Sequence, residues 1–216
     1  MPKALIFANG DSLDGPMVRR MLQSPAQWVI AADGGARVAL YYGYVPHVVI
    51  GDFDSLTDDE QHDLESRGVS LLRYPAEKDE TDLELALQWA ARQGAESICV
   101  VGGIGDRLDQ TLANVYLLAL PELRAIDVEL VAGRQSTRLV SAGTHTLSGA
   151  AGDTLSLLPL GGAVHGVTTD GLKYPLTNET LAFGPARGVS NVMLDHQATL
   201  TFNDGLLLVI HTLGRA

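Results

Sequence analysis

The first half of the chain alternates short apolar runs with amphipathic segments. The runs have the length and composition of buried strands, and helix-like segments lie between several of them. Strands that alternate with helices indicate a mostly parallel sheet covered by helices on both faces. The runs span residues 4–8, 28–32, 47–50, 70–74, 97–101 and 128–132.

The clearest helix is predicted over residues 81–93. Thr81 followed by Glu84 fits a capping box, Gly94 fits a C-terminal stop, and residues 57–60 repeat the Thr-x-x-Glu signal. Apolar residues at i, i+3, i+4 and i+7 spacing predict one buried stripe on this helix. The stripe consists of Leu83, Ala86, Leu87 and Ala90.

The pattern changes after about Gly133. Beyond this point short strand-like runs recur between Gly, Pro, Asn and Asp, and we find no convincing helical period. The stretch TLTFNDGLLLVIHTL is typical of a hairpin that turns at Asp204-Gly205. We therefore expect a Rossmann-like α/β domain over residues 1–133 and an all-β sandwich domain over residues 134–216.

Composition and charge narrow the function classes. The 216 residues are 46% hydrophobic, which is enough for a sizeable core. The formal net charge is −11, and no basic run is present, so we expect neither nucleic-acid nor membrane-surface binding. An anionic ligand would have to be held locally, by a metal ion, a few cationic side chains or backbone N–H groups.

The single cysteine, Cys99, permits no internal disulfide and lies in a strand-like run, so we interpret it as a small buried hydrophobe. The apolar part of the opening MPKALIFANGD is too short for a signal peptide. No apolar stretch is long enough to cross a bilayer. The expected location is cytoplasmic.

Polar clusters follow five successive predicted strands. In an open parallel sheet, ligands bind outside the carboxyl ends of the strands. One such cluster is ordinary turn chemistry, but five are hard to explain as turns alone. They are Asn9-Gly10-Asp11, Asp33-Gly34-Gly35, Asp52 with Asp54, Lys78 to Asp82, and Gly102 to Gln110.

Asp52 and Asp54 are candidate metal ligands. In extended backbone, residues i and i+2 point to the same side, so both carboxylates would face one hard cation such as Mg²⁺. The alternative, a turn or a helix cap, is about equally favoured by this pair alone. Asp79 and Asp82, at the start of the predicted helix, would add ligands directly or through water, although for this stretch in isolation N-terminal charge and capping are the favoured explanation.

Glycine-rich stretches suit a close approach of backbone to phosphate. GGIGDRLDQ precedes a helix candidate whose N-terminus attracts anions, although it completes neither G-x-G-x-x-G nor a Walker A loop. Arg107 in this stretch is either a phosphate clamp or a solvated loop residue.

Other chemistries find little support in the sequence. No G-x-S-x-G elbow is present, and the histidines show no zinc spacing, so we interpret them as surface or structural groups. They are His47, His62, His145, His165, His196 and His211.

The ordered motifs ADGGA, GDFDS, KDETD and GGIGDRLDQTLAN resemble those of the thiamine pyrophosphokinase family. The later stretch DGLKYPLTNETLAFGPARGVSN resembles the thiamine-binding part of that family. The resemblance spans nearly the whole chain. It implies an α/β catalytic domain, a C-terminal β-sandwich, and a homodimer with active sites at the subunit interface. It also implies transfer of the pyrophosphoryl group of ATP to the thiamine hydroxyl, with Mg²⁺, to give thiamine diphosphate and AMP.

The resemblance also implies roles for individual residues. The metal-associated carboxylates would be Asp52, Asp54 and Asp82, with Asp79 close by. Catalysis would use Asp52, Asp54, Asp82, Arg107 and Asp109. The nucleotide and phosphate site would include Asn9, Asp33, Gly34, Gly35, Lys78, Asp79, Thr81, Gly103, Gly105 and Gln110. Thiamine would be held by Asp109, Thr168, Tyr174, Ser190 and Asn191.

Two other functions stay open at this level. Asp52-Phe53-Asp54 is also the D-x-D pattern of a transferase that uses a sugar nucleotide. A non-catalytic thiamine or nucleotide sensor is the second alternative, although a sensor has no need of the full set of carboxylates. Tyr174 stands where animal members of the family usually have Trp, which gives a weaker π face for a cationic ring; plain interface packing is its alternative role.

Overall fold

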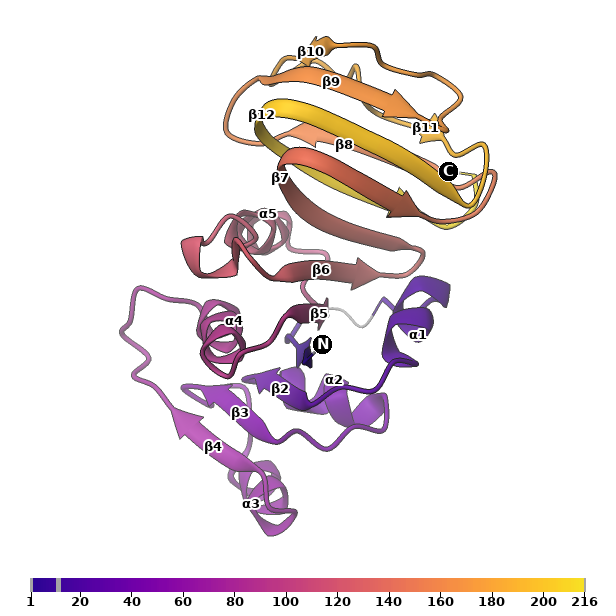
Figure 1. Ribbon diagram of the computed structural model, residues 1–216. Helices are drawn as coiled ribbons and strands as arrows, with labels where there is room; N and C mark the ends of the chain where they lie inside the picture. The colour runs from indigo at the N-terminus through magenta and orange to yellow at the C-terminus, as the bar shows by residue number, and fades with distance from the viewer. Residues whose placement is uncertain (1, 11–12, 216) are drawn as a thin grey trace. The chain divides into compact units, whose positions relative to one another are not determined.

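The computed structural model describes residues 2–10 and 13–215. The chain clusters into two compact units, Met1–Gly133 and Arg134–Ala216 (Figure 1). Asp11, from the first predicted polar cluster, lies outside the described residues.

The first unit is built on a six-stranded parallel sheet. Its strand order is β4-β3-β2-β1-β5-β6, and every neighbouring pair is parallel. The six predicted apolar runs are confirmed as these strands, with shifts of one residue at some ends. The strands are β1 (Lys3–Phe7), β2 (Trp28–Ala32), β3 (Val48–Gly51), β4 (Ser70–Arg73), β5 (Ser97–Val101) and β6 (Asp127–Ala132).

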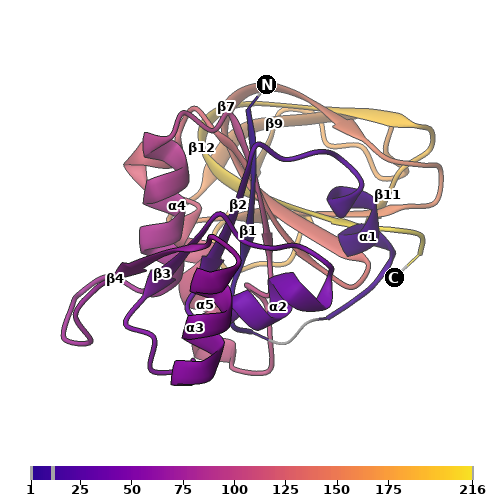
Figure 2. The same cartoon turned by 90° about the horizontal axis from the view of Figure 1, so that it is seen from below.

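Helices cover both faces of this sheet, as predicted. Figure 2 shows α4 on one side of β1 and β2, with α1 and α2 on the other side. Ala4, Leu5, Ile6 and Phe7 of β1 are accordingly fully buried, because both faces of the strand pack against other elements. The helices are α1 (Pro16–Leu22), α2 (Gly35–Tyr41), α3 (Asp58–Ser66), α4 (Asp82–Arg92) and α5 (Leu108–Leu117), followed by the short 3₁₀ helix η1 (Pro121–Leu123).

The helix ends follow the capping signals of the sequence. The Thr81 hydroxyl accepts a hydrogen bond from the backbone N–H of Glu84 at the start of α4. Gly94 has a φ of 78°, the left-handed conformation in which glycine ends a helix without strain. The capping box at Thr57 and Glu60 is complete in both directions. The predicted apolar stripe of α4 is buried at all four positions: Leu83, Ala86, Leu87 and Ala90.

The strand order reverses between β1 and β5, which places a ligand crevice at their carboxyl ends. Backbone hydrogen bonds hold these two ends together. Ala8 N–H donates to the Val101 carbonyl at 2.8 Å, and Gly10 N–H donates to the Gly102 carbonyl at 3.0 Å. The loops that follow β1 and β5 are therefore fixed side by side where the sheet topology favours binding.

The second unit consists of antiparallel strands, and none of its described residues is helical, as predicted. The long strand β12 pairs with β7 along its length. It also pairs with β9 through residues 199–204 and with β8 through residues 207–212. The strands are β7 (Gln135–Ser148), β8 (Thr154–Pro159), β9 (Val164–Asp170), β10 (Glu179–Leu181), β11 (Asn191–Val192) and β12 (Gln197–Thr212).

The predicted hairpin at Asp204-Gly205 is wrong. The segment is one continuous strand, β12, with a register irregularity between Phe202 and Leu206 opposite β7. Gly205 has a φ of 97°, so the Asp-Gly pair provides a bulge instead of a reversal. Both halves of β12 pair with the same partner strand, and this long-range pairing overrides the local turn signal.

No helix within residues 2–10 and 13–215 combines the length and the apolar character that crossing a membrane requires.

Candidate functional site

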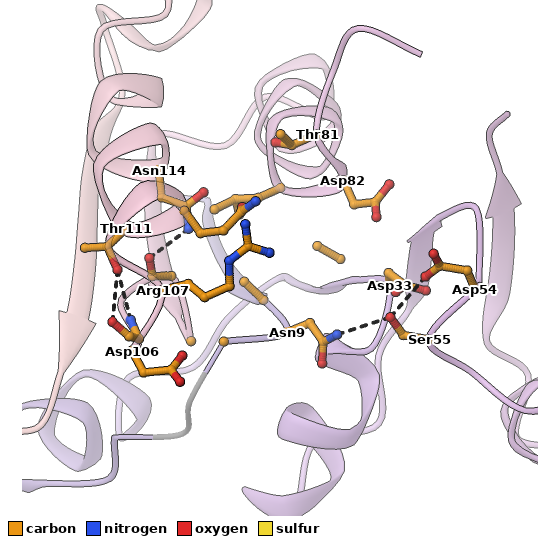
Figure 3. Close-up of a pocket in the computed structure, with 18 of the residues that line it drawn as sticks. Asn9, Asp33, Asp54, Ser55, Thr81, Asp82, Asp106, Arg107, Thr111 and Asn114 are labelled. Carbon is orange, nitrogen blue, oxygen red and sulfur yellow. Dashed lines mark hydrogen bonds between the residues drawn. The ribbon is translucent and has the colours of Figure 1, made fainter. Parts of the chain in front are cut away.

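A cavity of about 530 Å³ lies at the carboxyl ends of the strands of the first unit (Figure 3). Residues that follow each of β1 to β5 line it, so the predicted convergence is observed for part of each strand-end cluster. The lining includes Asn9, Gly10, Asp33, Asp54, Ser55, Lys78, Thr81, Asp82, Gly102, Gly103, Gly105, Asp106, Arg107, Gln110, Thr111 and Asn114.

Three carboxylates form an acidic cluster at this end of the sheet. Asp33, Asp52 and Asp82 each offer an oxygen, and these oxygens lie within 4.8 Å of one another. Asp33 is 5% exposed, and its buried Oδ1 has no hydrogen-bond partner. Buried oxygens without donors, all of the hard carboxylate type, fit the ligand preference of Mg²⁺.

The environment of Asp82 shows the charge balance of the acidic cluster. Burial raises the pKa of Asp82, the nearby Lys78 ammonium opposes this shift, and the carboxylates of Asp33 and Asp52 add to it. Lys78 Nζ lies 3.0 Å from Asp82 Oδ1 as an ion pair. The acidic cluster thus brings three carboxylates together, and the Lys78 ammonium is a positive charge in contact with Asp82.

Gly51, the last residue of β3, allows the carboxylates to approach. A Cβ at this position would lie 2.9 Å from the Asp33 Cβ and 3.2 Å from the Asp82 Cγ. Asp33 is itself held by a 2.9 Å hydrogen bond from its N–H to the Ile50 carbonyl. The end of β3 is therefore shaped to accept two neighbouring acidic side chains.

The extended geometry predicted for Asp52 and Asp54 is wrong. Phe53 has a φ of 66° and is 3% exposed, packed in an apolar cluster with Val49 and Leu64. Burial of this ring turns the backbone, so Asp52 and Asp54 do not follow strand alternation. Asp52 joins the acidic cluster, whereas Asp54 lines the cavity and accepts a 3.2 Å hydrogen bond from the Ser55 hydroxyl.

The other residues that the sequence assigned to the metal site do not all lie in the acidic cluster. Asp82 belongs to the acidic cluster, and Asp33, predicted for the nucleotide site, stands in it as well. Asp79 is exposed and is not among the residues that line the cavity. Of the predicted metal-associated residues, Asp52 and Asp82 therefore lie in the acidic cluster with Asp33, and Asp54 lines the neighbouring cavity.

Helix α5 contributes a polar face that sequence reasoning identified only in part. Positions 107, 110, 111 and 114 follow i, i+3, i+4, i+7 spacing, and all four line the cavity. The Thr111 hydroxyl accepts from the Gly105 N–H at 3.1 Å, and the buried Asn114 amide donates to the Gly103 carbonyl at 2.8 Å. These bonds fix the glycine-rich loop; Thr111 and Asn114 were not predicted individually, and their helical spacing from Arg107 is the signal that could have identified them.

Two further lining residues were missed, Ser55 and Asp106. Asn9 Nδ2 donates to the Ser55 hydroxyl at 3.2 Å, which connects the loops after β1 and β3. Asn9 and Ser55 are far apart in the sequence, so no local sequence pattern predicts this contact. The predicted Gly34 and Gly35 are buried at the start of α2 and are not among the lining residues.

Arg107 reaches into the cavity from the N-terminal end of α5 (Figure 3). Its guanidinium also forms two hydrogen bonds with Asp109, at 3.2 and 2.5 Å. Hydrogen bonding from Arg107 lowers the pKa of Asp109, which keeps that exposed carboxyl ionised. Asp109 itself is not among the lining residues.

The residues predicted to hold thiamine lie in the second unit, apart from Asp109. Tyr174 is 54% exposed, and the Lys173 ammonium lies 5.3 Å from the centre of its ring. The buried Asn191 amide accepts from the Tyr174 N–H at 3.0 Å and donates to the Tyr174 carbonyl at 2.7 Å. Asn191 therefore positions Tyr174 with its own polar atoms already engaged.

The remaining two predicted residues are tied to neighbouring backbone. The Thr168 hydroxyl accepts a hydrogen bond from the Asn178 N–H at 3.0 Å. Ser190 has a φ of 60°, and its N–H donates to the Ser156 hydroxyl at 3.0 Å. The side chains of Thr168 and Ser190 are on exposed residues, and their contact with a ligand stays a prediction.

Two family models match the chain. The model described as thiamin pyrophosphokinase, catalytic domain, matches residues 19–130. The model described as thiamin pyrophosphokinase, vitamin B1 binding domain, matches residues 144–207. The first match covers most of the unit that contains the cavity, and the second covers most of the antiparallel unit.

Individual proteins agree with the family models. Thiamine pyrophosphokinase from Bacillus subtilis is 32% identical over 184 residues, which cover 85% of this chain and 86% of the relative. Thiamin pyrophosphokinase 1 from Caenorhabditis elegans is 26% identical over 221 residues, covering 95% of this chain and 87% of the relative.

Solved structures extend the likeness to the whole fold. The crystal structure of the Bacillus subtilis thiamine pyrophosphokinase has a TM-score of 0.87 at 29% identity, with coverage of 98% of this chain and 99% of the other. That of a thiamin pyrophosphokinase family protein from Enterococcus faecalis has a TM-score of 0.85 at 28% identity, with complete coverage of both chains. Family models, relatives and fold agree that the chain belongs to the thiamine pyrophosphokinase family of ATP-dependent transferases.

Proposed function

We propose that the cavity at the carboxyl ends of β1 to β5 is the active site for pyrophosphoryl transfer from ATP to thiamine. The observation that carries this proposal is the acidic cluster of Asp33, Asp52 and Asp82 at the edge of a cavity that also holds Arg107 and Lys78. Carboxylates for a metal ion and cations for phosphate oxygens are what a polyphosphate site needs. The position at the reversal of strand order supports the same assignment.

The reaction transfers two phosphates in one step. The hydroxyl oxygen of thiamine attacks the β-phosphorus of ATP, and a new P–O bond forms. The bond between the β-phosphorus and the oxygen that bridges to the α-phosphorus breaks, and AMP leaves with that oxygen. The hydroxyl proton passes to a base, and Asp109, ionised beside Arg107, is our candidate for orienting the hydroxyl or taking the proton.

We propose that Asp33, Asp52 and Asp82 hold Mg²⁺, with Asp54 beside them and Asp79 acting at most through water. Bound Mg²⁺ would neutralise the negative charge of the polyphosphate. The described residues fit this ion, because the buried Asp33 Oδ1 has no hydrogen-bond donor.

The remaining lining groups would position the nucleotide. Arg107 extends into the cavity, where a guanidinium pairs with two phosphate oxygens at once. The loop of residues 102–107 is fixed by Thr111 and Asn114, which leaves its backbone N–H groups in place to meet an anion. Transfer reactions of this kind depend mainly on such positioning and charge stabilisation. Further members of this proposed nucleotide and phosphate site are Asn9, Asp33, Gly34, Gly35, Thr81, Gly103, Gly105 and Gln110.

We propose that Thr168, Tyr174, Ser190 and Asn191 hold thiamine in a homodimer. A half-exposed Tyr174 ring, fixed through its backbone by Asn191, suits stacking on a cationic heterocycle. Exposed large apolar side chains are present on both units, as expected of surfaces covered by a partner. They include Leu108, Leu112 and Tyr116 on α5, and Phe183, Val189 and Leu194 in the second unit.

Two broader assignments complete the proposal. We interpret the first unit as Rossmann-like from its reversed strand order, and the second as a sandwich because β12 pairs with β8 along one half and with β9 along the other. A cytoplasmic location suits an enzyme that uses ATP and carries one buried, unpaired cysteine.

The decisive test is product formation by the purified chain with ATP, Mg²⁺ and thiamine. We expect AMP and thiamine diphosphate in equal amounts, and no AMP when thiamine is omitted. Asp54→Asn should lower kcat on the order of 10²-fold, because charge stabilisation in the transition state is lost. Glu65→Gln, which removes one exposed carboxylate from α3, is the matched control and should keep full activity.

Other outcomes would contradict the proposal. Transfer from a sugar nucleotide in place of ATP would favour the D-x-D transferase. Tight binding of thiamine and ATP without AMP release would favour a sensor. Near-normal activity of Asp54→Asn would contradict the role of Asp54 at the metal site.

A further inference from the structure

Lys78 has an unusual environment for a lysine. It lies between β4 and α4 and lines the cavity, yet its side chain is only 12% exposed. Its Nζ donates to the Pro75 carbonyl at 3.2 Å and lies 3.0 Å from Asp82 Oδ1. Lysines are rarely buried unless they are paired, so the partner of this ammonium matters.

The partner carboxylate, Asp82, belongs to the acidic cluster. Asp82 Oδ1 is buried and has no hydrogen-bond partner, so the ammonium of Lys78 supplies its close polar contact. Asp82 also shares the 4.8 Å cluster with Asp33 and Asp52. Carboxylates this close repel one another unless a positive charge stands beside them. In the described structure, Lys78 brings such a charge to this cluster from a flexible four-carbon stem.

A divalent cation and the ammonium would compete for the same carboxylate, that of Asp82. Two cations in contact with one carboxylate repel, and the flexible stem of lysine lets its head group move at little cost. We propose that Lys78 is an exchangeable internal counter-ion: it neutralises Asp82 in the metal-free protein and is displaced when a divalent cation binds the acidic cluster. This inference rests on the proposed metal role of that cluster.

The first test measures the release of Lys78 directly. The lysines of the sequence are Lys3, Lys78 and Lys173, so acetylation of each can be followed by mass spectrometry of the full chain after digestion. We expect Lys78 to react slowly without metal, and several-fold faster with saturating Mn²⁺ or Mg²⁺ and no nucleotide. Lys3, which donates to the Met21 carbonyl, and the exposed Lys173 are internal controls and should not respond.

The second test measures the competition. In Lys78→Met the competing charge is gone, so we expect Mn²⁺ to bind about tenfold more tightly, as measured by calorimetry or electron paramagnetic resonance. The metal-free variant should also unfold at a lower temperature, because Asp82 loses its counter-ion. Lys78→Gln, which keeps a polar head group, should behave alike and serves if the Met variant folds poorly.

Arg67→Gln is the matched control for the second test. Arg67 forms an i,i+4 ion pair with Asp63 on the exposed face of α3, outside the cavity. Its removal should leave the affinity for Mn²⁺ and the unfolding temperature of the metal-free protein almost unchanged.

The outcomes separate this inference from the proposed function. Unchanged acetylation of Lys78 at saturating metal, absence of metal binding to the nucleotide-free protein, or equal or weaker Mn²⁺ binding by both Lys78 variants would each overturn it. Thiamine-dependent AMP formation by the wild-type protein would still stand in those cases. Loss of that activity with normal release of Lys78 would instead contradict only the proposed function.

Discussion

At the scale of single residues, the site is shaped by backbone conformations that side chains rarely adopt. Asp33, a member of the acidic cluster, has a φ of 45°, and Phe53, which follows Asp52 of that cluster, has a φ of 66°. Such conformations typically cost about 1–3 kcal/mol each and persist where the surrounding structure enforces them. Phe53 is held by its buried ring, and the Arg73 guanidinium lies 4.6 Å from the ring centre. Packing of one aromatic ring therefore directs two acidic side chains.

Gly51 gives the sharpest test at this scale. A Cβ in Gly51→Ala would lie 2.9 Å from the Asp33 Cβ, so the acidic cluster must shift. We expect a stability loss of about 1–3 kcal/mol from overpacking and a fall in kcat on the order of 10²-fold from misplaced ligands. Steady-state kinetics and thermal unfolding measure the two effects.

Gly162→Ala is the control for Gly51→Ala. Its Cβ would meet no heavy atom within 4 Å, and its backbone has no positive φ, so both measured quantities should stay at wild-type values. Wild-type kinetics in Gly51→Ala would show that the acidic cluster tolerates displacement, and would contradict the close-approach argument.

These residues also show what the sequence could and could not predict. The motif around Asp52 and Asp54 correctly indicated the end of the sheet at which the site lies, because buried runs and the ends of strands can be recognised in the sequence pattern. Their mutual geometry was mispredicted, since a positive φ at Phe53 depends on tertiary packing. The membership of Asp33 in the acidic cluster depends likewise on the pairing of β2 with β3, which strand patterns alone do not fix in register.

At the scale of elements, local signals succeeded where one segment decides its own conformation. Helix α4 begins at its Thr81 cap and buries its predicted stripe, because capping and periodicity are both local. The Asp204-Gly205 signal failed because residues on both sides of it pair with β7. A turn signal inside a strand-like run therefore does not predict a reversal where one long partner strand can pair with the residues on both sides of it.

In addition to its strand pairing, β12 is held at its C-terminal end by the carboxylate of Asp153. Asp153 Oδ2 accepts from His211 Nε2 at 2.7 Å and from the Ala150 N–H at 2.9 Å, and Oδ1 accepts from the Gly214 N–H at 2.6 Å. Burial acts to raise the pKa of Asp153, but the hydrogen bonds from Gly214, His211 and Ala150 outweigh it and hold that pKa below its usual range.

This arrangement predicts a stability difference that depends on pH. A depressed folded pKa contributes stability above the unfolded pKa of about 3.9, and this contribution is lost as the pH falls through the folded value. Asp153→Asn should therefore lower the free energy of unfolding by about 1–3 kcal/mol at pH 7, since an amide cannot accept all three bonds. Denaturant unfolding should show the gap between wild type and variant closing as the pH falls below about 3.9.

Asp195→Asn serves as the control for this pH series. Asp195 is largely exposed, and its Oδ1 accepts a hydrogen bond from the neighbouring His196 N–H. Its replacement should change the unfolding free energy little at any pH. A gap for Asp153→Asn that stays constant down to low pH would contradict the assignment of the effect to ionised Asp153.

At the scale of the whole molecule, the chain exposes large apolar side chains that the proposed homodimer would cover. On α5 they are Leu108, Leu112 and Tyr116, spaced i, i+4, i+8, so they form one stripe along the helix. Other positions of α5, Thr111 and Asn114, fix the glycine-rich loop of the cavity. A partner seated on the stripe would therefore hold the helix that shapes the phosphate site.

This stripe predicts how assembly and activity are linked. The wild-type protein should sediment as a dimer of twice the 23.0 kDa chain mass. Leu112→Glu should dissociate it, because an interface cannot bury an unpaired carboxylate without a large desolvation penalty. Val45→Glu is the matched control, since Val45 and Leu112 are both 45% exposed, and it should remain dimeric.

If thiamine is held across the interface, Leu112→Glu should raise KM for thiamine in proportion to the fraction of monomer. A monomeric wild type at assay concentrations, or a dimeric Leu112→Glu, would contradict the proposed interface, whereas full activity of a monomeric variant would place the complete thiamine site within one chain.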